Sequence, residues 1–328
     1  MRSLVISGYG VRLRYRKGLL LIESRDRRDE VPIADLDQVI VATGGVWLSS
    51  KVVRKLAEHG VDLLFLDSRG MPSGRVYPPF VSRTVETRRA QYTAYGTDAG
   101  TAIMKEIVRT KLANQSGLLR RYYRYVGQEE LRELANEIAS MAIEARELEA
   151  PFEEARERLR SIEAEAARLY WAGFSLLVPA DAGFEGRDQD SADPVNSCLN
   201  YAYGILYAES WRALVLAGLD PYAGFLHVDR SGRPVLAFDF VEMFRFAADL
   251  ALLNLLRHGW RPKLQNGLLD YGSRSKIVEA VNDVLERGRA RYLGEAPASV
   301  RQAMKKAAIA LASFLRGEGR FEGFVYGW

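Results

Sequence analysis

The chain has 328 residues, 48% of them hydrophobic and 27% charged, which is the composition of a folded globular protein and excludes wholesale disorder. Its net charge of +4 is mildly basic and by itself neither requires nor excludes a nucleic-acid partner. The single cysteine, Cys198, excludes an intrachain disulfide framework and a cysteine-rich zinc site, and fits a reducing compartment.

The N-terminal residues lack the apolar core of a signal peptide. No apolar run reaches the roughly 18 residues that a membrane span needs, and the longest, at 248–259, fits a buried helix. We therefore expect no membrane association and a cytoplasmic location.

Residues 1–80 have the pattern of a small β-rich, sandwich-like domain. Short β-branched or alternating runs, such as 3–8 and 38–43, are separated by clusters of Gly, Asp and Arg. A helix over 49–60 interrupts them, with a serine cap at its start and Gly60 at its end. A stretch with three prolines follows at 71–83, and we expect 81–98 to be a linker.

Beyond the linker the hydrophobic period changes from two to 3.6, which predicts a larger all-α domain over 99–328 and an α+β fold class. The capping residue Asp193 followed by Pro194 predicts the start of a long helix, which ends at Gly218. A brief strand is expected at 234–238. The other expected helices cover 99–126, 128–150, 152–172, 239–258, 273–289 and 297–316.

The candidate chemistry begins with the three histidines. His59 and His258 each precede a glycine at a predicted helix end, where a cation complements the helix dipole. His227 differs, because it lies outside any predicted helix. The next acids, Asp239 and Glu242, are spaced i,i+3 and therefore share one helix face.

A histidine with two carboxylates suits Mg²⁺ or Mn²⁺. The same spacing also allows a structural interpretation, in which Asp239 caps the helix and Glu242 pairs with Arg245. Spacing alone leaves both open, and it does not identify a third acid among the many glutamates of 144–165.

Residues 105–125 interleave basic and aromatic side chains, as phosphate contact and base stacking require, although a solvated basic helix gives the same pattern. The chain has neither a Gly-rich phosphate loop nor a nucleophile elbow, so a nucleic-acid enzyme is favoured over a small-molecule one. The basic residues of this run are Lys105, Arg109, Lys111, Arg120, Arg121 and Arg124.

Four stretches, at 162–171, 184–206, 217–227 and 236–245, resemble motifs of the CRISPR-associated endonuclease/integrase family Cas1. The first, at 162–171, is similar to the family's glutamate helix, in which the ligand precedes a tyrosine by seven positions; this selects Glu163 rather than Glu165. The others are FEGRDQDSADPVNSCLNYAYGIL (184–206), AGLDPYAGFLH (217–227) and LAFDFVEMFR (236–245).

The resemblance implies a site for Mg²⁺ or Mn²⁺ formed by Glu163, His227 and Glu242, with Asp239 as a second acid beside it. It also implies that Arg187, Asn196 and Tyr203 line the active-site region. With Arg245 and the arginines at 120, 121 and 124, these are the candidate DNA-binding residues.

The implied activity joins protospacer 3′-hydroxyl ends to a CRISPR repeat by metal-assisted transesterification, with nuclease side activity. The implied partners are double-stranded DNA, a second copy of the chain paired through the β domains, and the small protein Cas2, which would bridge two dimers. Two alternatives are a non-catalytic DNA-binding scaffold and a general metal-dependent DNA nuclease.

Overall fold

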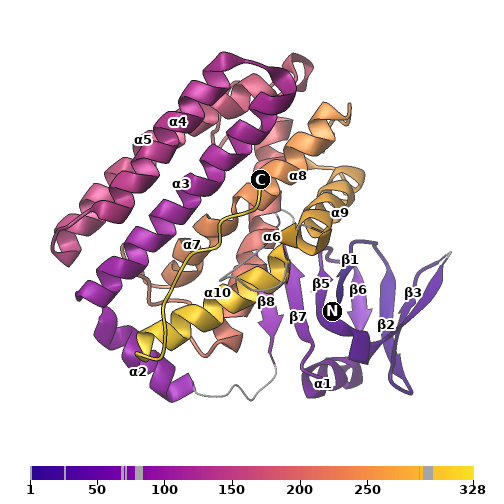
Figure 1. The fold of residues 1–328 in the computed structure, drawn as a ribbon. Coiled ribbons are helices and arrows are strands. Elements are labelled where there is room, and N and C mark those ends of the chain that lie inside the picture. The colour runs from indigo at the N-terminus through magenta and orange to yellow at the C-terminus, as the bar shows by residue number, and fades with distance from the viewer. Residues whose placement is uncertain are drawn as a thin grey trace.

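This computed structural model describes residues 2–25, 27–67, 70, 72–77, 84–287, 289–290 and 298–328. Figure 1 shows an N-terminal β-rich domain beside a larger body of helices, so the predicted α+β class is confirmed. In the described part of the chain, none of the helices combines the length and apolar character needed to cross a membrane.

The β-rich domain is built from two four-stranded sheets. The order of the first is β1 (Arg2–Ile6), β5 (Leu36–Val41), β7 (Asp62–Leu66) and β8 (Pro72–Val76), with only β8 antiparallel to its neighbour. The order of the second is β4 (Arg28–Pro32), β3 (Leu19–Glu23), β2 (Val11–Arg16) and β6 (Val46–Leu48).

One core joins the two sheets to helix α1 (Ser50–Glu58) and includes Leu13, Val39 and Leu56. The alternation in β2 explains its placement, because every second side chain faces this core while the intervening arginines are exposed. His59 is the C-cap of α1, as expected. The sheets therefore pack in the predicted sandwich-like manner.

The helical domain follows the 3.6-residue pattern closely. Its helices are α2 (Thr84–Ala94), α3 (Asp98–Val126), α4 (Glu129–Glu147), α5 (Phe152–Leu177), α6 (Pro194–Leu216), α7 (Val235–Val241), α8 (Phe246–Arg257), α9 (Tyr271–Arg287) and α10 (Val300–Leu315). Short 3₁₀ turns cover Ile33–Asp35 (η1), Ala180–Ala182 (η2) and Glu242–Phe244 (η3). Two small hairpins pair β9 (Leu264–Gln265) with β10 (Leu268–Leu269), and β11 (Arg289–Ala290) with β12 (Ala298–Ser299).

Three local predictions differ from the observed elements. Of the expected linker 81–98, residues 84–94 form α2, residue 98 begins α3, and 81–83 lie outside the described residues. The strand expected at 234–238 is instead the N-cap Pro234 and the start of α7, because a short helix that is mostly buried, and apolar apart from Asp239, shows no helical period. The single helix expected over 239–258 is α7, η3 and α8 in succession.

Helix α6 is the central element and is buried on nearly every side (Figure 1). Asp193 caps it by accepting the backbone N–H groups of Val195 and Asn196, as its sequence predicted. Cys198 is buried in the core, also as expected, and this burial raises the pKa of its thiol.

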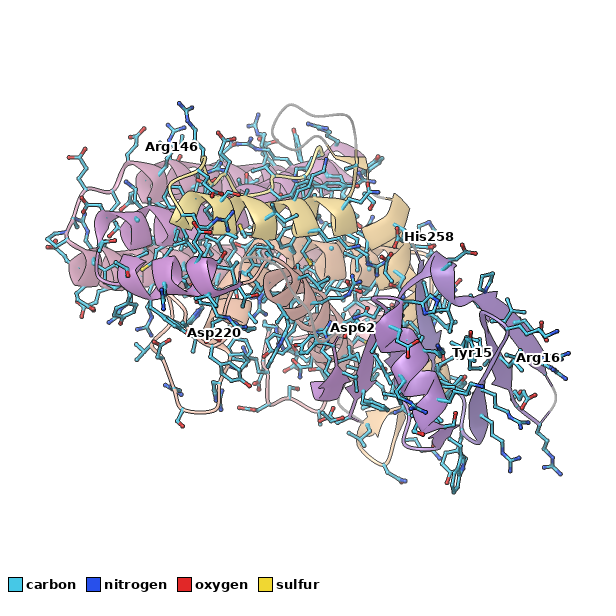
Figure 2. All side chains as sticks on the ribbon, turned by 90° about the horizontal axis from the view of Figure 1, so that it is seen from below. Tyr15, Arg16, Asp62, Arg146, Asp220 and His258 are labelled. Atoms are coloured by element: carbon cyan, nitrogen blue, oxygen red, sulfur yellow. The ribbon has the colours of Figure 1, made fainter. Side chains whose placement is uncertain are left out.

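Helix α6 also fastens the helical domain to the β-rich domain. A Cβ at Gly204 would lie 2.2 Å from the carbonyl oxygen of Gly70, so only glycine allows this approach. Nearby, Asp62 is buried where the two domains meet (Figure 2). Its carboxylate accepts Arg75 Nε at 2.8 Å and contacts Arg212 of α6 at 3.7 Å.

Candidate active site

A loop between α6 and α7 carries His227, and the buried carboxylate of Asp239 in α7 fixes it. Asp239 accepts the backbone N–H groups of Phe225 at 2.7 Å, Leu226 at 2.9 Å and His227 at 3.1 Å. The same carboxylate lies 2.6 Å from His227 Nδ1. A Cβ at Gly224 would approach Asp239 Oδ2 to 2.9 Å, so a glycine is required for this close packing.

The structural interpretation made Asp239 a helix cap, but the structure shows that it does not cap α7. Its side chain folds back onto the loop and fixes the imidazole so that Nδ1 faces the carboxylate and Nε2 faces away from it. Burial lowers the pKa of His227, but the hydrogen bond and charge of Asp239 outweigh it, and the net pKa is raised. Asp239 is a positioning acid beside the candidate ligand.

Two candidate ligand carboxylates meet at Lys111 of α3. Its Nζ lies 2.5 Å from Glu163 Oε1 on α5 and 2.6 Å from Glu242 Oε2 on η3. All three side chains are at most 14% exposed. Burial would raise the pKa of Glu242, but Arg245 and Lys111 outweigh it and hold this pKa well below its usual range.

Helix α3 also fixes the backbone next to Glu242. Asn114, one turn beyond Lys111, donates its side-chain amide to the carbonyl oxygen of Met243 at 3.0 Å and to that of Phe324 at 2.8 Å. The C-terminal tail and η3 are thus both held on α3, and Glu242 is placed opposite Lys111.

Glu163 and His227 line one open cavity of about 560 Å³ together with Lys111. Across the described ranges, no three His, Cys, Asp or Glu side chains are arranged to hold an ion as they stand. The Lys111 ammonium lies between the two carboxylates. Glu242 Oε2 is buried and has the ionic contact with Lys111 but no hydrogen bond of good geometry. Two carboxylates and an imidazole nitrogen are a donor set that fits a hard divalent ion.

A second cavity, of about 640 Å³, holds most of the other candidates from the motif region. Its lining includes Arg187, Tyr203 and Arg245. The guanidinium carbons lie 5.6 Å (Arg187) and 4.6 Å (Arg245) from the centre of the Tyr203 ring. Arg245 also donates Nε to Glu242 Oε1 at 2.8 Å, so it connects this cavity to the carboxylate pair.

Asn196 does not line this cavity, but it binds Arg187, which does. Its side-chain oxygen accepts Arg187 at 2.9 Å, and its amide group donates to the carbonyl oxygen of Gly186 at 2.8 Å and to Asp193 at 2.6 Å. Arg187 also donates to Asn200 Oδ1 at 2.6 Å. The guanidinium is therefore fixed by neutral amide oxygens, which leave its positive charge available to an anion.

An acid that the sequence analysis missed binds the Tyr203 hydroxyl. Asp249 of α8 accepts the hydroxyl of Tyr203 at 2.5 Å and that of Tyr170 at 2.7 Å. Burial raises the pKa of Asp249 to about 6, although the two hydroxyls and the arginines oppose the rise. The signal was available, because a lone acid inside the apolar run 246–256 needs a buried partner.

The three arginines from the basic run are not brought to this site. Arg120, Arg121 and Arg124 lie nine or more residues after Lys111 on α3, which places them roughly 13 Å or more along the helix. Arg120 donates to Asn136 of α4 at 2.9 Å, and Arg124 is exposed. Their role in DNA binding stays a prediction. His258, at the C-cap of α8, has the structural position expected of it.

Lys111 is the residue whose place the sequence analysis misjudged. It was grouped with the basic residues of a DNA-binding surface, whereas the structure buries it between two acids. The burial of Lys111 could have been suspected from its position, because the helical pattern of α3 places the neighbouring Leu112 and Asn114 on the core side.

Comparison with known proteins agrees with this arrangement of motifs. The sequence matches the family described as CRISPR associated protein Cas1 over residues 4–283. The chain belongs to the Cas1 family. It is 34% identical, over 99% of its length and 98% of the relative's, to the CRISPR-associated endonuclease Cas1 2 of Saccharolobus solfataricus. It is 38% identical, over 90% of its length and 95% of the relative's, to the CRISPR-associated endonuclease Cas1 1 of Pyrobaculum aerophilum.

Solved structures share the fold of this Cas1-family chain. A casposase bound to an integration product matches with a TM-score of 0.82 and 24% identity, over 98% of this chain and 93% of that one. A CAS1 protein from Thermotoga maritima matches with a TM-score of 0.76 and 21% identity, over 100% and 99%. A chain of a Cas6-RT-Cas1–Cas2 complex gives 0.75 and 20%, over 98% and 36%.

Proposed function

We propose that this chain is a divalent-metal-dependent DNA endonuclease and integrase of CRISPR adaptation. It joins the 3′-hydroxyl ends of a protospacer to a CRISPR repeat by transesterification, and hydrolyses DNA as a side reaction. The observation that carries the proposal is that Glu163 and His227 line one open cavity with Lys111, which also contacts Glu242, and that Asp239 orients His227.

Glu163, His227 Nε2 and Glu242 would hold Mg²⁺ or Mn²⁺. When bound, the ion would lower the pKa of the attacking hydroxyl and neutralise charge that develops on the phosphoryl oxygens. The chain itself contributes orientation, since Asp239 fixes the imidazole and Asn114 fixes the backbone beside Glu242. No side-chain nucleophile is needed, and the only cysteine is buried.

DNA would approach across the two neighbouring cavities. Arg187 and Arg245 place cationic groups against the Tyr203 ring, which is suited to phosphate contact combined with stacking. Arg245 also contacts Glu242, so bound DNA in this cavity would lie next to the carboxylates. The arginines at 120, 121 and 124 would extend the basic surface along α3.

The partners follow from the same proposal. The named relatives are CRISPR-associated endonucleases, and the similar solved structures include a casposase with an integration product and a complex that contains Cas1 and Cas2. We propose that this chain acts on double-stranded DNA as a homodimer formed through the β-rich domains. Cas2 would bridge two such dimers.

A strand-transfer assay tests the activity. A duplex with a labelled 3′-hydroxyl strand is incubated with a plasmid that carries the repeat, with Mg²⁺, Mn²⁺ or EDTA, and with or without Cas2. We expect covalently joined product with the divalent ions and none with EDTA, with Glu163→Ala or with Glu242→Ala. Glu165→Ala is the matched control, because Glu165 is exposed on the same helix as Glu163.

The other two functions predict different products. Metal-dependent cleavage without joined product, even with Cas2 present, would indicate a general nuclease. Tight DNA binding with neither joining nor cleavage would indicate a non-catalytic scaffold and would contradict the proposal.

A further inference from the structure

The Lys111 ammonium occupies the place that a divalent ion would need. It contacts Glu163 Oε1 at 2.5 Å and Glu242 Oε2 at 2.6 Å, and an ion bound to those oxygens would lie about 2 Å from each. The two cations compete for that space, since like charges this close together repel each other strongly. The side chain of Lys111 must leave before an ion can be held by both carboxylates.

The local charges favour a cation at this position at all times. Glu163, Glu242 and Asp239 supply three carboxylates. Among the described residues, Lys111 and Arg245 form ion pairs with the ligand carboxylates. Removing Lys111 with nothing in its place would leave Glu163 and Glu242 buried with like charges facing each other, which is strongly unfavourable. The ammonium therefore stabilises the fold of the metal-free protein.

The contact of Lys111 with Glu242 is nevertheless incomplete. Glu242 Oε2 is buried and makes no hydrogen bond of good geometry within the described residues, although the ammonium is 2.6 Å away. Lys111 also lines the open cavity, so its flexible side chain has space into which it can withdraw. The arrangement is that of a counter-ion that can be exchanged.

We propose that Lys111 is a built-in competitor of the catalytic metal ion: it holds Glu163 and Glu242 together in the metal-free protein and is displaced into the cavity when a divalent ion binds. This inference rests on the proposed metal site. The affinity for the metal ion would then be set by the exchange of one cation for another. The displaced ammonium would face the cavity into which a DNA phosphate would enter.

The first test compares Mn²⁺ binding to the wild-type chain and to Lys111→Met by electron paramagnetic resonance of the free ion. We expect the variant to bind Mn²⁺ about tenfold more tightly or better, since no ion pair has to be broken first. We also expect a lower melting temperature in EDTA that Mn²⁺ restores. Lys105→Met removes the same charge from another face of α3 and is the control, with unchanged affinity.

The second test needs no variant. Wild-type chain is reductively methylated with formaldehyde and a borohydride, and each lysine is followed by peptide mass spectrometry. Lys111 should be modified at least about tenfold more slowly than Lys105 in EDTA, because it is 12% exposed and bound by two acids. Saturating Mn²⁺ should bring the two rates together.

The outcomes separate this inference from the proposed function. In one outcome, wild type binds Mn²⁺ and Glu242→Ala does not, but Lys111→Met binds it no more tightly and Mn²⁺ does not change the methylation rate of Lys111. The competitor role of Lys111 is then wrong, and the proposed metal site stands. If folded wild type and folded Lys111→Met both fail to bind Mn²⁺, the inference and the proposed metal dependence are overturned together.

Discussion

Asp239 and His227 are joined by a contact of 2.6 Å between Oδ1 and Nδ1, and the same carboxylate accepts three backbone N–H groups from the loop that carries the histidine. One buried acid thus sets both the path of the loop and the direction of the imidazole. The candidate ligand is therefore placed by Asp239 of α7 as well as by its own loop.

Asp239→Ala should therefore damage stability and metal binding together. Removing the carboxylate leaves three buried donors unpaired, and we expect a loss of about 3 kcal/mol or more in the free energy of unfolding by urea. Mn²⁺ affinity should fall about 10- to 100-fold, because His227 loses its orienting partner. Asp229→Ala, in the same loop but exposed, should change either quantity little. Equal effects of the two substitutions would refute the assigned role.

Glu163→Gln should lower strand transfer by about 100-fold or more, because the neutral amide is a poor ligand for a divalent ion. Glu165→Gln, two residues away, should leave the rate within about twofold, since its side chain is 54% exposed and its ion pair with Arg168, at 3.8 Å, is a surface pair. Single-turnover rates with Mn²⁺ measure both. A loss of activity in Glu165→Gln alone would mean that the wrong glutamate has been assigned.

Asp249 should make the fold less stable as the pH rises. Its pKa is raised to about 6 in the folded chain, from about 3.8, so the folded state binds the proton more tightly than the unfolded state. Stability is then lost as pH rises from about 4 to 6, by up to about 3 kcal/mol. Asp249→Asn removes this charge.

The measurement is the urea unfolding of wild type and Asp249→Asn between pH 4.5 and 7.5. The difference in unfolding free energy should shift in favour of the variant as the pH rises, and level off above pH 7. Taking the difference cancels the other titrating groups. A pH-independent difference would show that the Asp249 carboxyl does not titrate in this range.

Asp62 should be among the costliest acids to remove, because it holds the two domains together without exposure to water. Its side chain is 2% exposed and binds Arg75, while Gln38 donates to it at 2.7 Å. Asp62→Ala leaves buried cations without their partner and should cost about 3–5 kcal/mol.

Asp29→Ala is the comparison, since its pair with Arg27 at 2.7 Å is exposed and should contribute at most about 1 kcal/mol. The melting temperatures of both variants, measured by thermal unfolding, test this difference. Similar melting temperatures for Asp62→Ala and Asp29→Ala would contradict the assigned role at the junction.

The sequence by itself determined most of the elements of this protein. Long helices such as α3 and α6 were predictable because their apolar period and caps are local properties, and Asp193 with Pro194 marks the start of α6 directly. The fold class and the sandwich-like domain followed from the change of period near residue 80. Helix α7 was not predictable, because a seven-residue helix that is mostly buried carries no period that distinguishes a helix from a strand.

The candidate site, too, was predictable from the sequence only in part. Motif resemblance selected Glu163, His227 and Glu242, and the i,i+3 spacing placed Asp239 near Glu242. Only tertiary packing decided that Asp239 turns to the loop, that Glu242 turns to α3, and that Lys111 lies between two acids, one of them 52 residues away. Periodicity reports that a side chain is buried but not what it faces, and the partner of a buried charge is set by contacts of a few ångströms between distant segments.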